Sequence, residues 1–202
     1  MAKIQAYNNT IINAGWRRDG EKGGCVYAEK NALVNVFNNL MVNCKFRAMT
    51  PNYDQPNNPD EGYCSQSVID YNYYASGTQK SDIVFEDESG VAYSWEGYAY
   101  KHKNYYEGVV DAHSIITKSE AECAVNDPKF VNFPINDVAL TDYIYQDAWD
   151  FHVQADSPVL TGAYDGNDEA MAPYFGTEGL KVNGQTYTSP AVEARYGAYG
   201  TK

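Results

Sequence analysis

Two arginines at matching positions of a sequence repeat offer the most specific chemistry in this chain. Arg17 and Arg47 lie 30 residues apart, and each closes one copy of the repeat. If the copies form neighbouring strands, about 5 Å apart, the two guanidinium groups would repel each other unless an anion lies between them. That anion is either an acid of the following loop, Asp19 or Glu21, in a surface salt bridge, or the carboxylate of a uronic-acid ligand held by paired hydrogen bonds.

The ligand alternative predicts a cationic binding site in the first 47 residues. This stretch holds seven basic and three acidic residues, although the whole chain carries a formal charge of -12. The overall negative charge argues against nucleic acid as the main partner, because phosphate would be repelled by the average field. The residues assigned to the ligand-binding site are Trp16, Arg17, Arg18, Lys45 and Arg47.

A second candidate site is the acidic run DGNDE near the C-terminus. It supplies four side chains with hard oxygen ligands at loop spacing, which suit calcium. The run lacks the full calcium-loop pattern, so a solvated acidic loop is the competing interpretation. The candidate calcium ligands are Asp165, Asn167, Asp168 and Glu169.

The remaining reactive side chains form no familiar motif. The histidines, His102, His113 and His152, are too dispersed in sequence to suggest a metal site, and no GxSxG, HExxH or phosphate-binding loop occurs. The four cysteines either form two disulfides, in any of three pairings, or are buried thiols. Cys44 takes the repeat position of Ala14, which favours a small packing residue. The four are Cys25, Cys44, Cys64 and Cys123.

The repeat also predicts the elements that would position these side chains. The Asn-Asn pair ending at Asn9 aligns with the pair ending at Asn39, and Asn72 follows 33 residues later. Asparagine tolerates the left-handed backbone of a tight bend, and amides stacked in successive coils can hydrogen-bond to one another. We therefore predict about three coils between residues 3 and 77, with Asn9, Asn39 and Asn72 as a structural ladder in vertical register.

Composition and local patterns predict a folded, strand-rich chain. Of its 202 residues, 44% are hydrophobic and 19 are tyrosine, a mixture that favours strands and bends over long helices. Residues 81–108 alternate like a Tyr-rich hairpin with a turn near 88–90, and would serve either as a sugar platform or as a packing flap. A short helix is expected to begin near Ser119.

The ends and the apolar runs of the sequence bear on where the protein works. No stretch reaches the roughly 18 apolar residues of a membrane span, so the chain is not expected to cross a membrane. The chain opens in mid-strand without a secretory signal, and we therefore expect its natural beginning to lie further upstream.

Several motifs, taken in order, resemble a known family. NNTIINAG, VFNNLMVNC, DYNYY, DPKFVN and DFHVQADSPVLTGA look like the closing coils of right-handed parallel β-helix proteins with the pectin-lyase-like fold, over roughly residues 3–165. The resemblance implies an all-β solenoid, here a truncated C-terminal portion: coils over 1–165, the Tyr-rich insertion at about 81–108, and an irregular tail, 166–202, packed on the last coil. It also implies a secreted, periplasmic or outer-surface protein of a bacterium that uses polysaccharides.

Two classes of function follow from the resemblance and the residues. The first is a surface or secreted module that binds a polysaccharide, including anionic ones, or acts as a scaffold in glycan capture. The alternative is the C-terminal part of a pectate-lyase-like polysaccharide lyase, or of a glycoside hydrolase, acting on an anionic glycan. No catalytic motif of such enzymes matches residue by residue. In either case we expect an N-terminal β-helix portion, or another protein, to cover the first coil.

Overall fold

A computed structural model describes most of the chain, and strands dominate it. The described residues are 2–16, 25–26, 32–45, 47, 68–80, 85–86, 92–93, 111–175, 180–182, 184–187 and 190–202. In this part of the chain, helix is limited to α1 (Glu120–Val125) and the short 3-10 turns η2 (Thr78–Lys80) and η3 (Pro158–Leu160). The strand-rich, helix-poor fold agrees with the all-β prediction.

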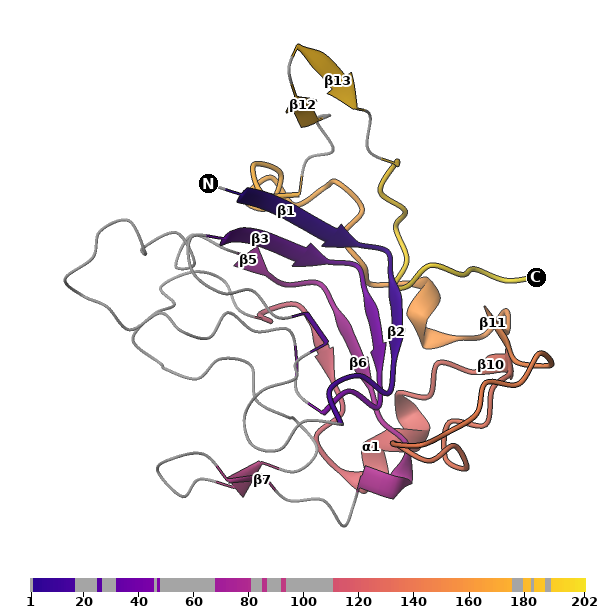
Figure 1. The fold of residues 1–202 in the computed structure, drawn as a ribbon. Coiled ribbons are helices and arrows are strands. Elements are labelled where there is room, and N and C mark those ends of the chain that lie inside the picture. Colours follow the sequence, from indigo (N-terminus) through magenta and orange to yellow (C-terminus); the bar gives the residue numbers. More distant parts are fainter. Residues whose placement is uncertain are drawn as a thin grey trace.

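Two parallel sheets form the centre of the molecule and run side by side (Figure 1). In each sheet, successive strands along the chain are neighbours. The first two strands of each sheet pair at an offset of 30 residues, as Ile4 opposite Val34 shows, and the next pair at 33, as Leu40 opposite Tyr73 shows. The first sheet contains β1 (Ala2–Tyr7), β3 (Ala32–Phe37) and β5 (Val68–Ile69). The second contains β2 (Thr10–Ile12), β4 (Leu40–Val42), β6 (Tyr73–Ala75) and β9 (Ile115–Ile116).

Left-handed residues make the bends between the two sheets. Asn8 and Asn38 have φ angles of 50° and 55° where the chain leaves the first sheet, and Asn13 and Asn43 have φ angles of 53° and 51° after the second. Asparagine occupies this region of backbone space at little cost, which explains why the repeat preserves it. Tyr71 takes the same conformation in the third coil, with φ of 53°.

The amides next to these bends form a hydrogen-bonded ladder. Asn9 donates from its backbone N–H (3.0 Å) and its side chain (2.9 Å) to Oδ1 of Asn39. Asn39 donates in the same way to Oδ1 of Asn72, at 3.2 and 2.9 Å. The ladder continues to Ser114, whose Oγ accepts from the backbone N–H of Asn72 at 2.9 Å. The ladder fixes the vertical register of the coils because each rung satisfies a bend of its neighbour.

The two faces of the second sheet pack against different partners. On β4, Met41 points into a cluster between the sheets with Val36 and Ile69. Leu40 and Val42 point the other way, into a cluster that also contains side chains from residues 130–163 and Tyr196. This alternation is the period of a strand, and it buries both faces.

The C-terminal segments cover the outer faces of the coils. Strands β10 (Phe130–Asn132) and β11 (Asp150–Val153) pair antiparallel and carry part of the second sheet's outer core. Phe175 stacks on Phe37 at 4.2 Å and covers the first sheet. The last segment crosses the coils where Gly197 donates to the carbonyl of Asn38 at 2.9 Å. A Cβ at this glycine, whose φ is 83°, would meet Leu40 within 2.9 Å, so only glycine fits.

Three local predictions can be compared with the strands and the helix. The helix follows Ser119, as predicted, with Glu120 and Glu122 in its first turn. The hairpin predicted around 88–90 is present, since β7 (Phe85–Glu86) pairs antiparallel with β8 (Ala92–Tyr93). The C-terminal tail is less irregular than expected. It contains a second hairpin, formed by β12 (Leu180–Val182) and β13 (Gln185–Tyr187).

Candidate functional site

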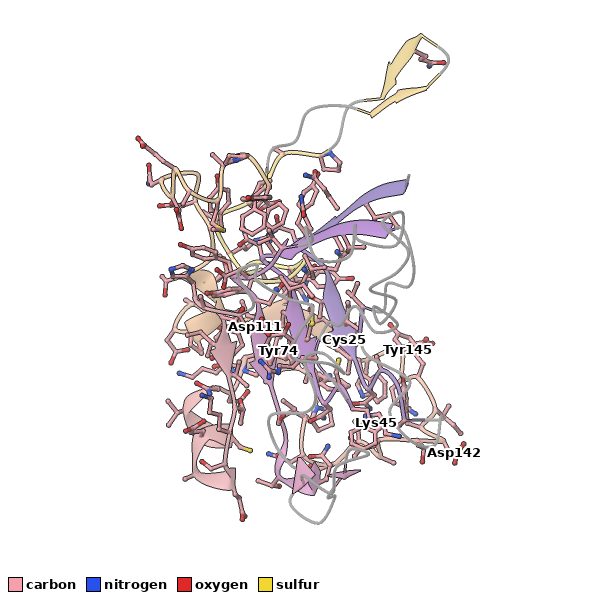
Figure 2. The ribbon with its side chains drawn as sticks, turned by 90° about the vertical axis from the view of Figure 1, so that its left-hand side faces the viewer. Cys25, Lys45, Tyr74, Asp111, Asp142 and Tyr145 are labelled. Carbon is pink, nitrogen blue, oxygen red and sulfur yellow. The ribbon has the colours of Figure 1, made fainter. Side chains whose placement is uncertain are left out.

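Arg47 lies in a buried ion pair. Its Nη1 is 2.9 Å from Oδ2 of Asp111, and the two side chains are only 15% and 2% exposed. The other carboxylate oxygen accepts from Oγ of Ser114 at 2.7 Å, which connects the pair to the end of the asparagine ladder. Figure 2 shows Asp111 beside Tyr74, whose ring lies 5.9 Å from the Arg47 guanidinium carbon. Burial raises the pKa of Asp111, and the charge of Arg47 opposes that rise.

The cationic site predicted from the sequence is therefore only partly visible, and its described members do not form an open anion site. Arg17 and Arg18 lie outside the described residues. Lys45 is 5% exposed, and the indole N–H of Trp16 donates to the carbonyl of Asn43 at 2.6 Å. Arg47 binds an acid, but Asp111 comes from a distant segment that neither sequence alternative considered. A large anionic ligand would have to displace Asp111 to reach this guanidinium.

A second polar arrangement is centred on His113. The carboxylate of Asp70, which is fully buried, accepts from the backbone N–H and from Nδ1 of His113, both at 2.6 Å. The ring of Tyr71 stacks on the imidazole at 4.6 Å, and the Tyr71 hydroxyl donates to Oδ2 of Asp168 at 2.8 Å. The His113 side chain is 49% exposed. Because Nδ1 is held by Asp70, Nε2 is the nitrogen through which this ring can exchange a proton with a ligand.

The acidic run near the C-terminus forms local turns. Asp165 accepts from the backbone and side-chain amides of Asn167 at 2.9 and 2.7 Å, and these bonds lower its pKa. The hydroxyl of Tyr71 is the main cause of the lowered pKa of Asp168, which also accepts from the N–H of Ala170. Glu169 is exposed. Within the described ranges, no group of three or more His, Cys, Asp or Glu side chains is placed to hold a metal ion. Calcium at this run stays a prediction.

The largest group of exposed aromatic side chains lies in a segment that the sequence analysis did not single out. Tyr143 and Tyr145 are 43% and 59% exposed, and their rings lie 6.2 and 5.5 Å from the ring of Trp149. Tyr199, from the C-terminal segment, extends the group through Phe151 at 6.2 Å. We call this group the aromatic surface. Its members are Tyr143, Ile144, Tyr145, Trp149, Phe151 and Tyr199.

The aromatic surface is held firmly by the core beneath it. Trp149 meets the buried ring of Phe133 edge-on at 5.1 Å, and Phe151 meets Phe130 at 5.8 Å. The side-chain amide of Asn132 donates to the carbonyl of Ala148 at 2.6 Å and so fixes the loop that carries the two tyrosines. The exposed rings are thus presented on a braced support.

Polar and acidic groups border the aromatic surface. Asp142 is exposed next to Tyr143, and Figure 2 shows it with Tyr145 at one edge of the molecule. Gln146 and Asp147 follow Tyr145 and are also exposed. On the other side, Asp150 accepts from Lys202 at 2.6 Å and from His152 at 2.7 Å, and these bonds, with Lys202 first, lower its pKa. The border supplies hydrogen-bonding groups without an excess of positive charge.

The sequence did contain a signal for this surface. Residues 143–149 read YIYQDAW, with three aromatic rings in seven positions and polar residues between them. Sequence alone could not show that these rings face solvent. For Asp70 and His113 the signal is weaker, because the two residues are 43 positions apart and meet only when the third coil forms.

Comparison with protein families, with curated proteins and with solved structures gave no match in any of the three cases. The described part of the chain contains no helix with the length and apolar character needed to cross a membrane.

Proposed function

We propose that this protein is a glycan-binding module whose aromatic surface holds a neutral polysaccharide. The observation that supports this proposal is the set of exposed, contiguous rings at Tyr143, Tyr145 and Trp149. Rings of this kind offer a flat apolar face to the C–H groups of a sugar. Tyrosine hydroxyls and the indole N–H keep polar contacts at the ring edges. Tyr and Trp also lose little side-chain entropy on binding, because they have only two rotatable side-chain bonds.

The charges around the rings favour a neutral glycan over an anionic one. Asp142 and Asp147 are exposed beside the tyrosines, and carboxylates accept hydrogen bonds from sugar hydroxyls but repel uronates and phosphates. The nearest described cation, Lys202, is paired with Asp150. This proposal therefore moves the ligand site away from Arg47, where Asp111 already neutralises the guanidinium.

For the fold, we infer that the two parallel sheets are the closing coils of a right-handed parallel β-helix, as the sequence resemblance implies. The inference is supported by the offsets of 30 and 33 residues between paired strands, by the left-handed asparagines at both bends and by the amide ladder. Such modules hold carbohydrate ligands on a rigid stack of coils. We keep the expectation that this one works outside the cell or on its surface.

The test is a binding panel with paired variants. Affinity electrophoresis and calorimetry would compare two neutral glycans, xylan and a mixed-linkage glucan, with polygalacturonate and alginate. Removing both rings with Tyr143→Ala and Tyr145→Ala should weaken binding to a neutral glycan by roughly 5- to 150-fold, since an aromatic contact contributes about 0.5 to 1.5 kcal/mol.

The matched control is Tyr174→Ala. Tyr174 is 39% exposed, lies outside the aromatic surface, and contributes to the fold through its backbone carbonyl, which accepts from Gln5. This variant should bind like the unaltered protein. Binding of polygalacturonate or alginate that survives loss of both rings would contradict the proposal, as would an absence of binding to every glycan in the panel.

One observation supports the enzymatic alternative as a second candidate. The imidazole of His113 is half exposed and held by a buried carboxylate, an arrangement suited to proton transfer in a lyase or hydrolase. If so, polyuronates should yield unsaturated products detectable by their ultraviolet absorbance, and His113→Ala should abolish that signal without altering binding at the aromatic surface. A signal unchanged in His113→Ala would remove this candidate.

A further inference from the structure

Two of the four cysteines meet in the space between the sheets. Cys25 lies in the connection between β2 and β3, and Cys44 follows the left-handed Asn43 at the end of β4. Their thiols are hydrogen-bonded to each other, and the sulfur of Cys25 lies 2.9 Å from that of Met41. Both cysteines belong to the same apolar cluster (Figure 2 shows Cys25 within the body of the molecule, near Tyr74).

The surroundings of the pair suit a sulfur–sulfur bond. Cys44 is 7% exposed and lies directly below Ala14, whose carbonyl accepts from the N–H of Lys45 at 2.9 Å. Besides the Cys25 thiol, the polar atoms recorded within 4 Å of the Cys44 sulfur are the carbonyls of Ile11 and Val42, both at 3.8 Å. No strong competing hydrogen bond in the described part of the chain would be lost if the two sulfurs joined.

We propose that Cys25 and Cys44 are the partners of a disulfide that ties the connection between the first two coils to the second coil. The reaction is exchange with a small-molecule disulfide, such as oxidised glutathione. One cysteine, as its thiolate, attacks the oxidant and forms a mixed disulfide while reduced glutathione leaves. The second cysteine then displaces the other glutathione. Two protein thiols lose two hydrogens and two electrons in total, and one glutathione disulfide becomes two glutathione thiols.

The pair chooses one connectivity where the sequence left three open. The third described cysteine, Cys123, lies in α1, and its sulfur contacts the carbonyl of Ser119 at 3.7 Å. Cys64 lies outside the described residues. A pairing of Cys25 or Cys44 with either of these would break the contact between the two thiols, so peptide mapping separates the possibilities.

Burial sets the rate at which this bond forms. Desolvation raises the pKa of the Cys25 thiol well above its ordinary value, so little thiolate is present in the folded protein. We therefore expect slow oxidation of the folded, reduced chain, and rapid oxidation when the chain folds in a glutathione redox buffer. Once formed, the bond should resist reduction until the protein is unfolded.

The bond should also stabilise the fold. It would close a loop of 18 intervening residues, and a cross-link of this span raises the melting temperature of a chain of this size by roughly 6 to 12 °C in the loop-entropy description. The comparison is between protein refolded with the glutathione couple and the same protein kept in a phosphine reductant. The variant Cys44→Ala should lack the difference and still fold, because alanine occupies the equivalent position of the first coil.

The experiment is refolding of the full chain with oxidised and reduced glutathione, alkylation of remaining thiols, and non-reducing peptide mapping by mass spectrometry. We expect one cross-linked peptide pair containing Cys25 and Cys44, with Cys123→Ser as the control variant that retains it. Recovery of Cys25 and Cys44 both alkylated after this treatment would overturn the proposal. Detection of either cysteine joined to Cys64 or Cys123 would overturn it as well.

Discussion

Asn39 is the middle rung of the amide ladder, and its replacement by alanine should destabilise the protein strongly. Its side chain is fully buried, and its Nδ2 donates at 2.9 Å to three acceptors: Oδ1 of Asn72 and the carbonyls of Phe37 and Ala6. Its Oδ1 accepts two bonds from Asn9. No other residue of the described coils supports both a coil above and a coil below through one side chain.

The size of the effect follows from the groups left behind. Alanine at position 39 leaves the carbonyl of Phe37 without its side-chain donor in a place that water does not reach. Oδ1 of Asn72 keeps only the longer bond from the backbone, at 3.2 Å. Each buried polar group left unsatisfied costs about 1 to 3 kcal/mol. We therefore expect Asn39→Ala to lower the free energy of unfolding by about 3 to 5 kcal/mol, a large fraction of the 5 to 15 kcal/mol typical of a domain.

Urea denaturation followed by circular dichroism measures this loss, with Asn9→Ala as the matched control. Asn9 makes the same type of bonds, but it is exposed at the open end of the ladder, where water replaces the lost partners. Its substitution should cost only about 1 kcal/mol. Equal losses for the two variants, or a loss below about 1 kcal/mol for Asn39→Ala, would refute the view that the ladder holds the coils in register.

Three further predictions concern charge, pH and association. Replacing Arg47 with methionine leaves Asp111 buried and unpaired, so unfolding should become easier by about 3 to 5 kcal/mol at pH 7. The loss should shrink near pH 4, because a raised pKa of the folded acid makes stability fall as pH rises above 3.8, and urea unfolding at both pH values checks the sign. Burial raises the pKa of Tyr196 to about 12, so the protein should lose stability from pH 10 to 12 by up to about 2.7 kcal/mol, and Tyr196→Phe should reduce that slope in alkaline unfolding curves. Ile4 is 50% exposed on β1, the edge strand of the first sheet, so Ile4→Lys should reduce concentration-dependent association in sedimentation experiments, and a monomeric unaltered protein at high concentration would contradict this.

The sequence predicted the parts of the fold that depend on local chemistry. The spacing of the Asn-Asn pairs matches the offsets at which the strands pair, because a bend that needs a left-handed residue recurs once per coil. The helix after Ser119 was also predictable, since two acids in its first turn favour that end of the helix dipole.

The long-range contacts could not be predicted from local patterns. Arg47 and Asp111 are 64 residues apart and meet only because the intervening chain returns to the same stack. The sequence comparison instead paired Arg47 with Arg17, which shares its repeat position. The exposure of Tyr143 and Tyr145 depends on how residues 130–151 pack on the coils, and the run YIYQDAW is equally compatible with a buried strand until that packing is known.

The most direct test of the central claim is a crystal structure of the protein with the neutral oligosaccharide that binds best in the panel. We predict a sugar ring lying face to face with Tyr143 or Tyr145, with a hydroxyl donating to Asp142 or Asp147. A sugar seated at Arg47, on the Tyr-rich segment 81–108, or at any other face would contradict the assignment of the aromatic surface as the glycan site.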